Sequence, residues 1–167
     1  MLKKPLYLVV VSWLLVAPAW GKEAKTKFKS IEVTRFTKQE GVETPPELPD
    51  FLMAALSDDL KKSGVFEQTI GKGEVVDPSD APQSVVLHGT LLEYGKGSVK
   101  KRLIPYAGAM GAGGKTLRVR ITVQRRSDNQ TMLEREIKER LPYEYRAEQL
   151  AKFLAKKIAK EIKNGLR

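Results

Sequence analysis

The fold is decided by the stretch TLRVRITVQRR, residues Thr116–Arg126, in which apolar and polar side chains alternate. Successive side chains of a β-strand point to opposite faces, so this alternation predicts a strand with one buried face. The inward side chains are predicted to be Leu117, Val119, Ile121 and Val123, and the outward ones Arg118, Arg120, Thr122 and Gln124. One apolar and one polar face are typical of antiparallel sheets that are covered on one side only.

The same alternation recurs on both sides of this stretch. Ser84–Tyr94 alternates between two faces, one with Val85, Leu87, Gly89 and Leu91 and the other with Val86, His88, Thr90 and Leu92. Ser127–Gln130 has the composition of a tight turn, and Thr131–Glu139 returns with Leu133 and Ile137 inward and Glu134, Glu136 and Lys138 outward. Antiparallel strands pair side chains across a hairpin, so we expect the outward arginines close to these glutamates.

The amino-terminal half predicts two short strands and a helix. Ser30–Thr37 is predicted as a strand, with Ile31, Val33 and Arg35 on one face and Glu32, Thr34 and Phe36 on the other. Gln39–Pro49 is rich in proline and predicts a loop. A helix is predicted from Pro49 to a cap at Gly64, because Leu52, Ala55, Leu56 and Leu60 recur at helical spacing. Val65–Ile70 predicts a strand and Gly71–Gln83 a long exposed loop.

A second helix is predicted for Tyr145–Lys163, after Pro142 ends the last strand. Its apolar stripe, flanked by alanines and opposed by lysines, consists of Leu150, Leu154, Ile158 and Ile162. We therefore predict an α+β fold: one antiparallel or mixed sheet of about five strands with two helices packed on one face. The outer face of the sheet is expected to be polar, basic and open to solvent.

The amino terminus has the pattern of a secretory signal peptide. Lys3 and Lys4 precede the apolar stretch Leu6–Val16, and Ala17-Pro18-Ala19 is a small-x-small cleavage site, with Ala19-Trp20-Gly21 as an alternative frame. We expect a signal peptide over 1–21, a mobile basic lead-in over 22–29 and one α+β domain over 30–167. Cleavage near residue 19 or 21 predicts a periplasmic or secreted protein; retention of the segment as an anchor is the alternative.

The composition narrows the protein class further. The 167 residues include no cysteine, which excludes a lipobox, disulfides and thiolate metal sites, so a lipid-anchored lipoprotein is not expected. The absence of cysteine favours a bacterial periplasmic protein. The formal net charge of +10 suits an anionic partner, although it also serves solubility alone.

The glycine-rich segment between two predicted strands contains a loose phosphate-loop pattern, Ala109–Thr116. A phosphate loop needs a helix after its lysine, whereas a strand is predicted here, so nucleotide binding is the less favoured interpretation. The segment is either a plain hairpin connection or an exposed apolar loop that binds a partner or membrane. The residues of such a partner-binding loop are Leu103, Ile104, Tyr106, Met110 and Lys115.

No residue pattern indicates catalysis. His88 is the single histidine, so a metal site would depend on carboxylates beside it, and a hydrogen-bonded sheet histidine is the simpler interpretation. No Ser–His–Asp arrangement stands out, and Asp58 and Asp59 point in different directions on a helix. We expect no enzyme activity, no cofactor and no metal, and the exported location speaks against a nucleic-acid partner.

Several segments resemble an uncharacterised bacterial family of secreted and lipoprotein domains, domain of unknown function 4410. The segments, within residues 28–163, are Ile31–Phe36, Ser63–Phe66, Val86–Leu91, Leu117–Val123 and the closing alanine-rich helix. The glycine that members often carry in the later hairpin turn is replaced by Met132 here. More distantly, the layout is similar to small domains of the curli secretion channel and the amino-terminal part of TolB. The resemblance implies a role in the cell envelope.

These observations predict a non-catalytic periplasmic or secreted envelope domain. It would bind another envelope component, expected to be a protein, through the glycine-rich loop and the basic face. The alternative is an envelope protein that binds anionic lipid, and the less favoured third hypothesis is a nucleotide-binding protein that uses Lys115 and Thr116.

Overall fold

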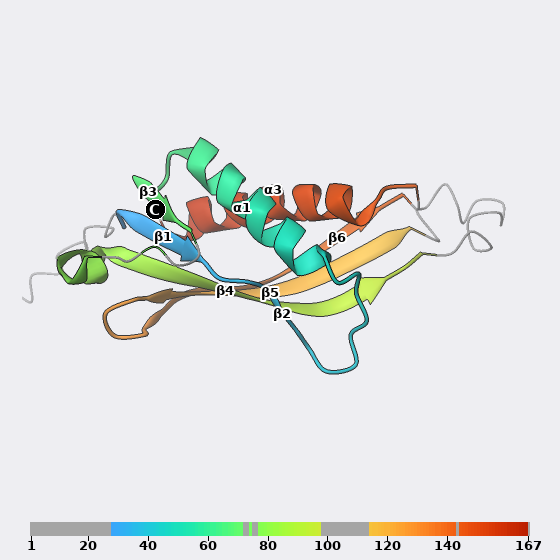
Figure 1. The fold of residues 1–167 in the computed structure, drawn as a ribbon, viewed down its shortest axis with the longest axis horizontal. Coiled ribbons are helices and arrows are strands. Elements are labelled where there is room, and N and C mark those ends of the chain that lie inside the picture. Colours follow the sequence, from blue (N-terminus) through green and yellow to red (C-terminus); the bar gives the residue numbers. More distant parts are fainter. Residues whose placement is uncertain (1–27, 72–73, 75–76, 98–113, 143, 167) are drawn as a thin grey trace, which may run out of the picture.

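The structure, a computed structural model, describes residues 28–71, 74, 77–97, 114–142 and 144–166. In this part of the chain, two α-helices lie side by side on one face of a mixed six-stranded sheet, and the other face is uncovered (Figure 1). The predicted α+β class is confirmed. None of the described helices combines the length and the apolar character that a membrane crossing needs.

The sheet has the strand order β3-β1-β4-β5-β6, with β2 also beside β4. Its strands are β1 (Ser30–Val33), β2 (Thr37–Lys38), β3 (Gln68–Ile70), β4 (Ser84–Gly95), β5 (Lys115–Arg125) and β6 (Thr131–Leu141). β4, β5 and β6 form an antiparallel meander, whereas β1 runs parallel to both β3 and β4. The inward side chains predicted for the meander are buried, Leu117, Val119, Ile121 and Val123 completely.

The two helices close the core from one side. α1 (Leu48–Ser63) begins with Pro49 in its first turn and ends at Gly64, whose φ of 61° is the left-handed conformation that glycine adopts most easily. α3 (Ala147–Gly165) buries the predicted stripe of Leu150, Leu154, Ile158 and Ile162. Both helices run in the same direction along the sheet (Figure 1).

The first strand is shorter than predicted, and this changes which side chains it buries. β1 ends at Val33; the Thr34 amide still donates a hydrogen bond to the Leu87 carbonyl of β4 at 3.0 Å, but 35–36 belong to no strand before β2 begins. Phe36, predicted on the face opposite Ile31 and Val33, is only 3% exposed and lies in the core with them, whereas Arg35, predicted on their face, is exposed and pairs with Asp50 at 2.9 Å. The prediction for these two residues is wrong because the strand is interrupted before it reaches them, so the two-residue period does not extend to them.

Two connections also differ from their predictions. The second predicted strand begins only at Gln68, with Phe66 buried in the turn before it. The region predicted as loop up to Gln83 contains a 3-10 helix, η1 (Pro78–Gln83). The Asp77 carboxylate accepts a hydrogen bond from the Ser79 amide at 2.9 Å, and Pro78 occupies the first turn, so a cap and a proline together start this helix.

The uncovered face of the sheet is a ladder of ion pairs. Arg120 contacts Glu136 at 2.5 Å and Glu134 at 3.7 Å, as the hairpin pairing predicted. Glu93 pairs with Arg118 and Lys138, and Arg126 pairs with Glu32. These pairs join four basic with four acidic side chains, so the face is polar, as predicted, but is not the strongly basic surface that was expected.

The free edge of β6 is partly blocked by a side chain from the helix layer. The Lys157 ammonium of α3 donates a hydrogen bond to the Lys138 carbonyl at 3.1 Å and pairs with Glu139 at the same distance. One outward carbonyl of the edge strand is therefore already occupied, and the helix is tied to the strand.

Candidate functional site

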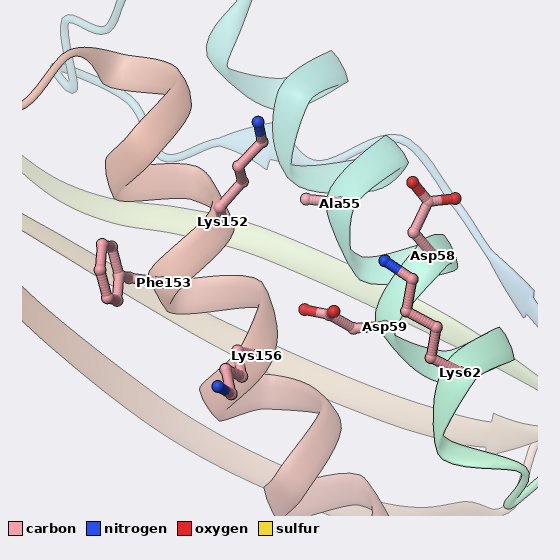
Figure 2. A pocket seen from close by; sticks show the side chains of 7 residues that line it. All are labelled: Ala55, Asp58, Asp59, Lys62, Lys152, Phe153 and Lys156. Carbon is pink, nitrogen blue, oxygen red and sulfur yellow. The ribbon is translucent and has the colours of Figure 1, made fainter.

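A groove runs between the outer surfaces of α1 and α3, on the side of the helix layer that faces away from the sheet (Figure 2). Its volume is about 370 Å³. We call it the α1–α3 groove and define it by its lining residues, Ala55, Asp58, Asp59, Lys62, Lys152, Phe153 and Lys156. Below it, the leucine and isoleucine stripes of the two helices are fully buried, and of the groove residues Ala55 also packs against this core.

The groove is lined by both acidic and basic side chains, and one of its three lysines, Lys62, lies on α1 together with the acids. Asp58 and Asp59 lie on α1, and Lys152 and Lys156 lie on α3, with Asp59 pointing across toward α3 (Figure 2). Lys152 also pairs with Glu148, one turn earlier, at 2.7 Å, and this contact lowers the pKa of the Glu148 carboxyl. Among the described residues, no opposite charge lies within 4 Å of Asp58, Asp59 or Lys156. These three groups are therefore available to an external partner.

Phe153 is the apolar element of the groove. Within the described residues it is the large apolar side chain that is left most exposed, at 49%. Its ring meets that of Tyr145 edge to face, with centroids 5.9 Å apart. Phe153 was not among the predicted site residues, because it lies outside the i, i+4 stripe of α3. An aromatic residue on the lysine-rich face of an amphipathic helix is the signal that points to it.

The residues of the predicted partner-binding loop are placed only in part. Leu103, Ile104, Tyr106 and Met110 lie outside the described residues. Lys115 is described: it opens β5, and its ammonium donates a hydrogen bond to the Tyr145 carbonyl at 2.6 Å. The strand predicted after this lysine is confirmed, so the chain here lacks the helix that a phosphate loop places after its lysine.

His88 lies on the uncovered face of the sheet, and its Nδ1 is 3.3 Å from the Thr34 hydroxyl. This contact matches the interpretation as a hydrogen-bonded sheet histidine. In the described ranges, no three His, Cys, Asp or Glu side chains are grouped as metal ligands would be.

A second pocket, of about 570 Å³, lies where the loop after β2 passes the end of β4. It is lined by Lys38, Val42, Glu43, Thr44, Pro45, Tyr94 and Lys96. Burial raises the pKa of the Tyr94 phenol, and Glu43 approaches Lys96 at 3.4 Å. The chain continues from this pocket into residues 98–113, which are not described, so its walls are less completely defined than those of the α1–α3 groove.

The excess of positive charge lies largely outside the residues that the structure describes. Of the 30 lysines and arginines, 20 lie in the described ranges, together with 19 of the 20 acidic residues, which gives that part a net charge of only +1. The remaining 10 basic residues and one acidic residue lie mainly in residues 1–27 and 98–113. A strongly cationic surface therefore has to come from those segments.

The fold defines a small two-layer α+β domain, and solved structures of this kind are known. The chain is similar to the dodecamer of PelC from Paraburkholderia phytofirmans, at a TM-score of 0.57 and 11% identity over 84% of this chain and 91% of PelC. It is also similar to the hypothetical protein CT253 from Chlamydia trachomatis, at a TM-score of 0.57 and 11% identity over 83% of this chain and 98% of that chain. A third similar structure is XCC0632 from Xanthomonas campestris, of domain of unknown function 330, at a TM-score of 0.53 and 11% identity over 89% of this chain and 90% of that chain.

These likenesses show the fold alone, because the identities are so low. No protein-family model matches the sequence, and no curated protein does either. The resemblance to domain of unknown function 4410 therefore stays a prediction, while the broader expectation of a fold used by uncharacterised bacterial proteins is met.

Proposed function

We propose that this chain is a non-catalytic domain of the bacterial cell envelope that binds another envelope protein at the α1–α3 groove. The observation that carries the proposal is the combination of the exposed Phe153 with charged side chains that have no ion partner in the described part. Protein interfaces typically place an aromatic anchor inside a charged rim. The signal-peptide pattern at the amino terminus supports the envelope location.

The groove suits a protein surface better than a small molecule. It is open to solvent along the two helices, and its lining residues other than Ala55 and Phe153 are all charged (Figure 2). A pocket for a small molecule would enclose most of its ligand, whereas an open charged groove is matched by a complementary surface. PelC, which shares the fold, is a dodecamer, so this architecture supports protein–protein contacts in at least one relative in structure.

Photo-crosslinking in intact cells tests this proposal. A photoreactive phenylalanine analogue at position 153 is expected to capture a defined envelope protein, identified by mass spectrometry. The same analogue at Glu40, which is exposed, lies in the loop after β2 and is not among the residues that line the groove, serves as the control. Capture should be lost when Asp59→Lys is added. Equal capture from both positions, or none from position 153, would contradict the groove as the binding site.

The glycine-rich loop is a second contact in the same proposal. β4 and β5 remain paired as far as Gly95 and Thr116, so the connection between them begins at one end of the sheet. Its apolar residues Leu103, Ile104, Tyr106 and Met110 would add to binding there. Deletion of residues 106–113 is expected to weaken recovery of the partner that position 153 captures; recovery at the full level would remove the loop from the proposal.

Binding to anionic lipid is the second candidate, and the uneven charge distribution favours it. Since the described part has a net charge of only +1, the basic residues outside it are the ones able to meet a negatively charged surface. Changing Lys100, Lys101 and Arg102 to glutamine should abolish most binding to phosphatidylglycerol vesicles. Binding should also weaken steeply with salt and be absent on neutral vesicles. Vesicle binding that persists after the glutamine substitutions and at high salt would contradict recognition of the anionic lipid by these basic residues.

A further inference from the structure

We infer that the protein bound at the α1–α3 groove presents an acidic segment, and that this segment lies along the outer face of α3. The inference rests on the proposed function, because it names the chemistry of the partner that the same site would bind. It is carried by a row of lysines on α3 beside the exposed Phe153. We call this row the lysine strip and define it by Lys152, Lys156, Lys160 and Lys163.

The lysine strip follows from the spacing of its members in α3. Side chains three or four positions apart lie on the same face of an α-helix, and the four lysines are separated by four, four and three positions. At 1.5 Å per residue the strip extends about 16 Å along the helix. Phe153 follows the first of these lysines directly and points away from α1 (Figure 2). The outer face of α3 therefore places one large apolar side chain beside a row of positive charges.

Most of the charge of the lysine strip is not neutralised by acids of the described residues. Lys152 pairs with Glu148 at 2.7 Å, but within the described ranges the other three lysines of the strip have no ion partner. The second acid of α3, Glu161, comes two turns after the buried Leu154 and so lies on the side turned toward the sheet. The outer face of α3 thus keeps an excess of positive charge, which is complementary to acidic groups.

The acids of α1 favour a protein segment over an anionic membrane as the source of the negative charge. Asp58 and Asp59 line the groove beside the strip, together with Lys62. A flat anionic surface that covered α3 would also reach these two carboxylates, which repel it. A protein can place its acids over α3 and a basic or neutral group opposite Asp59. An apolar residue of the segment would cover Phe153, and removal of this half-exposed ring from water favours binding.

Charge reversal on the lysine strip tests the inference in intact cells. The photoreactive phenylalanine analogue stays at position 153, and Lys156→Glu and Lys160→Glu are added. The yield of crosslinked partner should fall by about tenfold or more, because the new carboxylates meet the acids of the segment. The peptide of the partner that is joined to position 153, identified by mass spectrometry, should be rich in aspartate and glutamate. Replacement of those acids by lysine should restore capture by the double variant.

A matched control carries Lys38→Glu and Arg140→Glu, the same change of charge at exposed positions of β2 and β6, and should capture the partner like the unaltered chain. Circular dichroism verifies that each variant is folded. Undiminished capture after the reversal on α3, or a captured peptide without acidic residues, would overturn the inference and leave the proposed function standing. Binding to phosphatidylglycerol vesicles that the same reversal abolishes would also overturn it, because the strip would then serve a membrane. If position 153 of the otherwise unaltered chain captures nothing, the proposed function fails as well.

Discussion

The ring of Phe36 occupies the space that a side chain at position 89 would fill, because Gly89 has no side chain. A Cβ added to Gly89 would overlap the Phe36 ring. Gly89 lies in the middle of β4 and faces the core, where an alternating pattern calls for an apolar side chain. The glycine could be read from the sequence as part of the inward face, but its companion could not, because Phe36 reaches it from 53 positions earlier in the chain.

The first prediction concerns this pair. Gly89→Ala should lower the free energy of unfolding by about 1–3 kcal/mol, because the new methyl group overpacks the core against the ring. Gly95→Ala, in the same strand, is the control: its Cβ would lie 3.5 Å from the nearest atom, an ordinary contact. Urea denaturation measures both. Adding Phe36→Leu should reduce the cost of the alanine at position 89, and independent, additive effects would contradict this packing.

The second prediction separates a structural role of Lys115 from a nucleotide-binding one. Lys115→Met keeps the aliphatic stem and removes the hydrogen bond to the Tyr145 carbonyl, so it should cost about 1 kcal/mol of stability. Calorimetric titration with Mg-ATP should give only heats of dilution for the unaltered chain and for the variant. A binding isotherm that Lys115→Met abolishes would reverse this assignment.

At the scale of the elements, the periodicity of apolar residues was sufficient to predict the meander and the two helices. The long strands and helices carry their pattern over 11 residues or more, so an error at one end does not change which face is buried. The short elements were predicted less accurately. β3 has three residues and β2 two, too few to show a period, and the 3-10 helix depends on a side-chain cap at Asp77 rather than on apolar spacing.

Two adjacent residues of α3 give the third prediction. Leu154 is fully buried, so Leu154→Ala should lower the unfolding free energy by about 2–5 kcal/mol through lost contacts and a cavity. Phe153 is half exposed, and Phe153→Ala should cost about 1 kcal/mol or less, the worth of its contact with Tyr145. Denaturation curves of the two variants measure the difference. A large loss for Phe153→Ala would mean that this side chain serves the core rather than a partner.

At the scale of the whole molecule, the two-layer arrangement followed from the sequence, but the candidate site did not. The groove needs α1 and α3 in contact, although their sequences are separated by the entire β3–β6 region. Amphipathic patterns say which side of each helix faces the sheet, yet they do not say which residues of the two helices end up opposite each other.

The fourth prediction concerns acid stability. Hydrogen bonds from Ser79 lower the pKa of the Asp77 carboxyl, and Lys152 lowers that of Glu148. The folded state therefore binds fewer protons than the unfolded state just below the ordinary values of 3.8 and 4.5. The stability these groups contribute is present above those values and is lost as pH falls through the folded pKa values. Urea midpoints between pH 6 and pH 3 should fall less for an Asp77→Asn, Glu148→Gln double variant than for the unaltered chain.

The contact of Lys157 with the carbonyl of Lys138 affects how readily other molecules can add a strand to the sheet. A sheet whose last strand is free invites further strands from neighbouring molecules, and such growth has no natural end. Here a new strand would have to displace a side chain anchored in α3 before it could align with β6. Growth of the sheet by strands added at this edge is thereby disfavoured, because the helix layer holds one of the hydrogen-bonding groups that such growth would need.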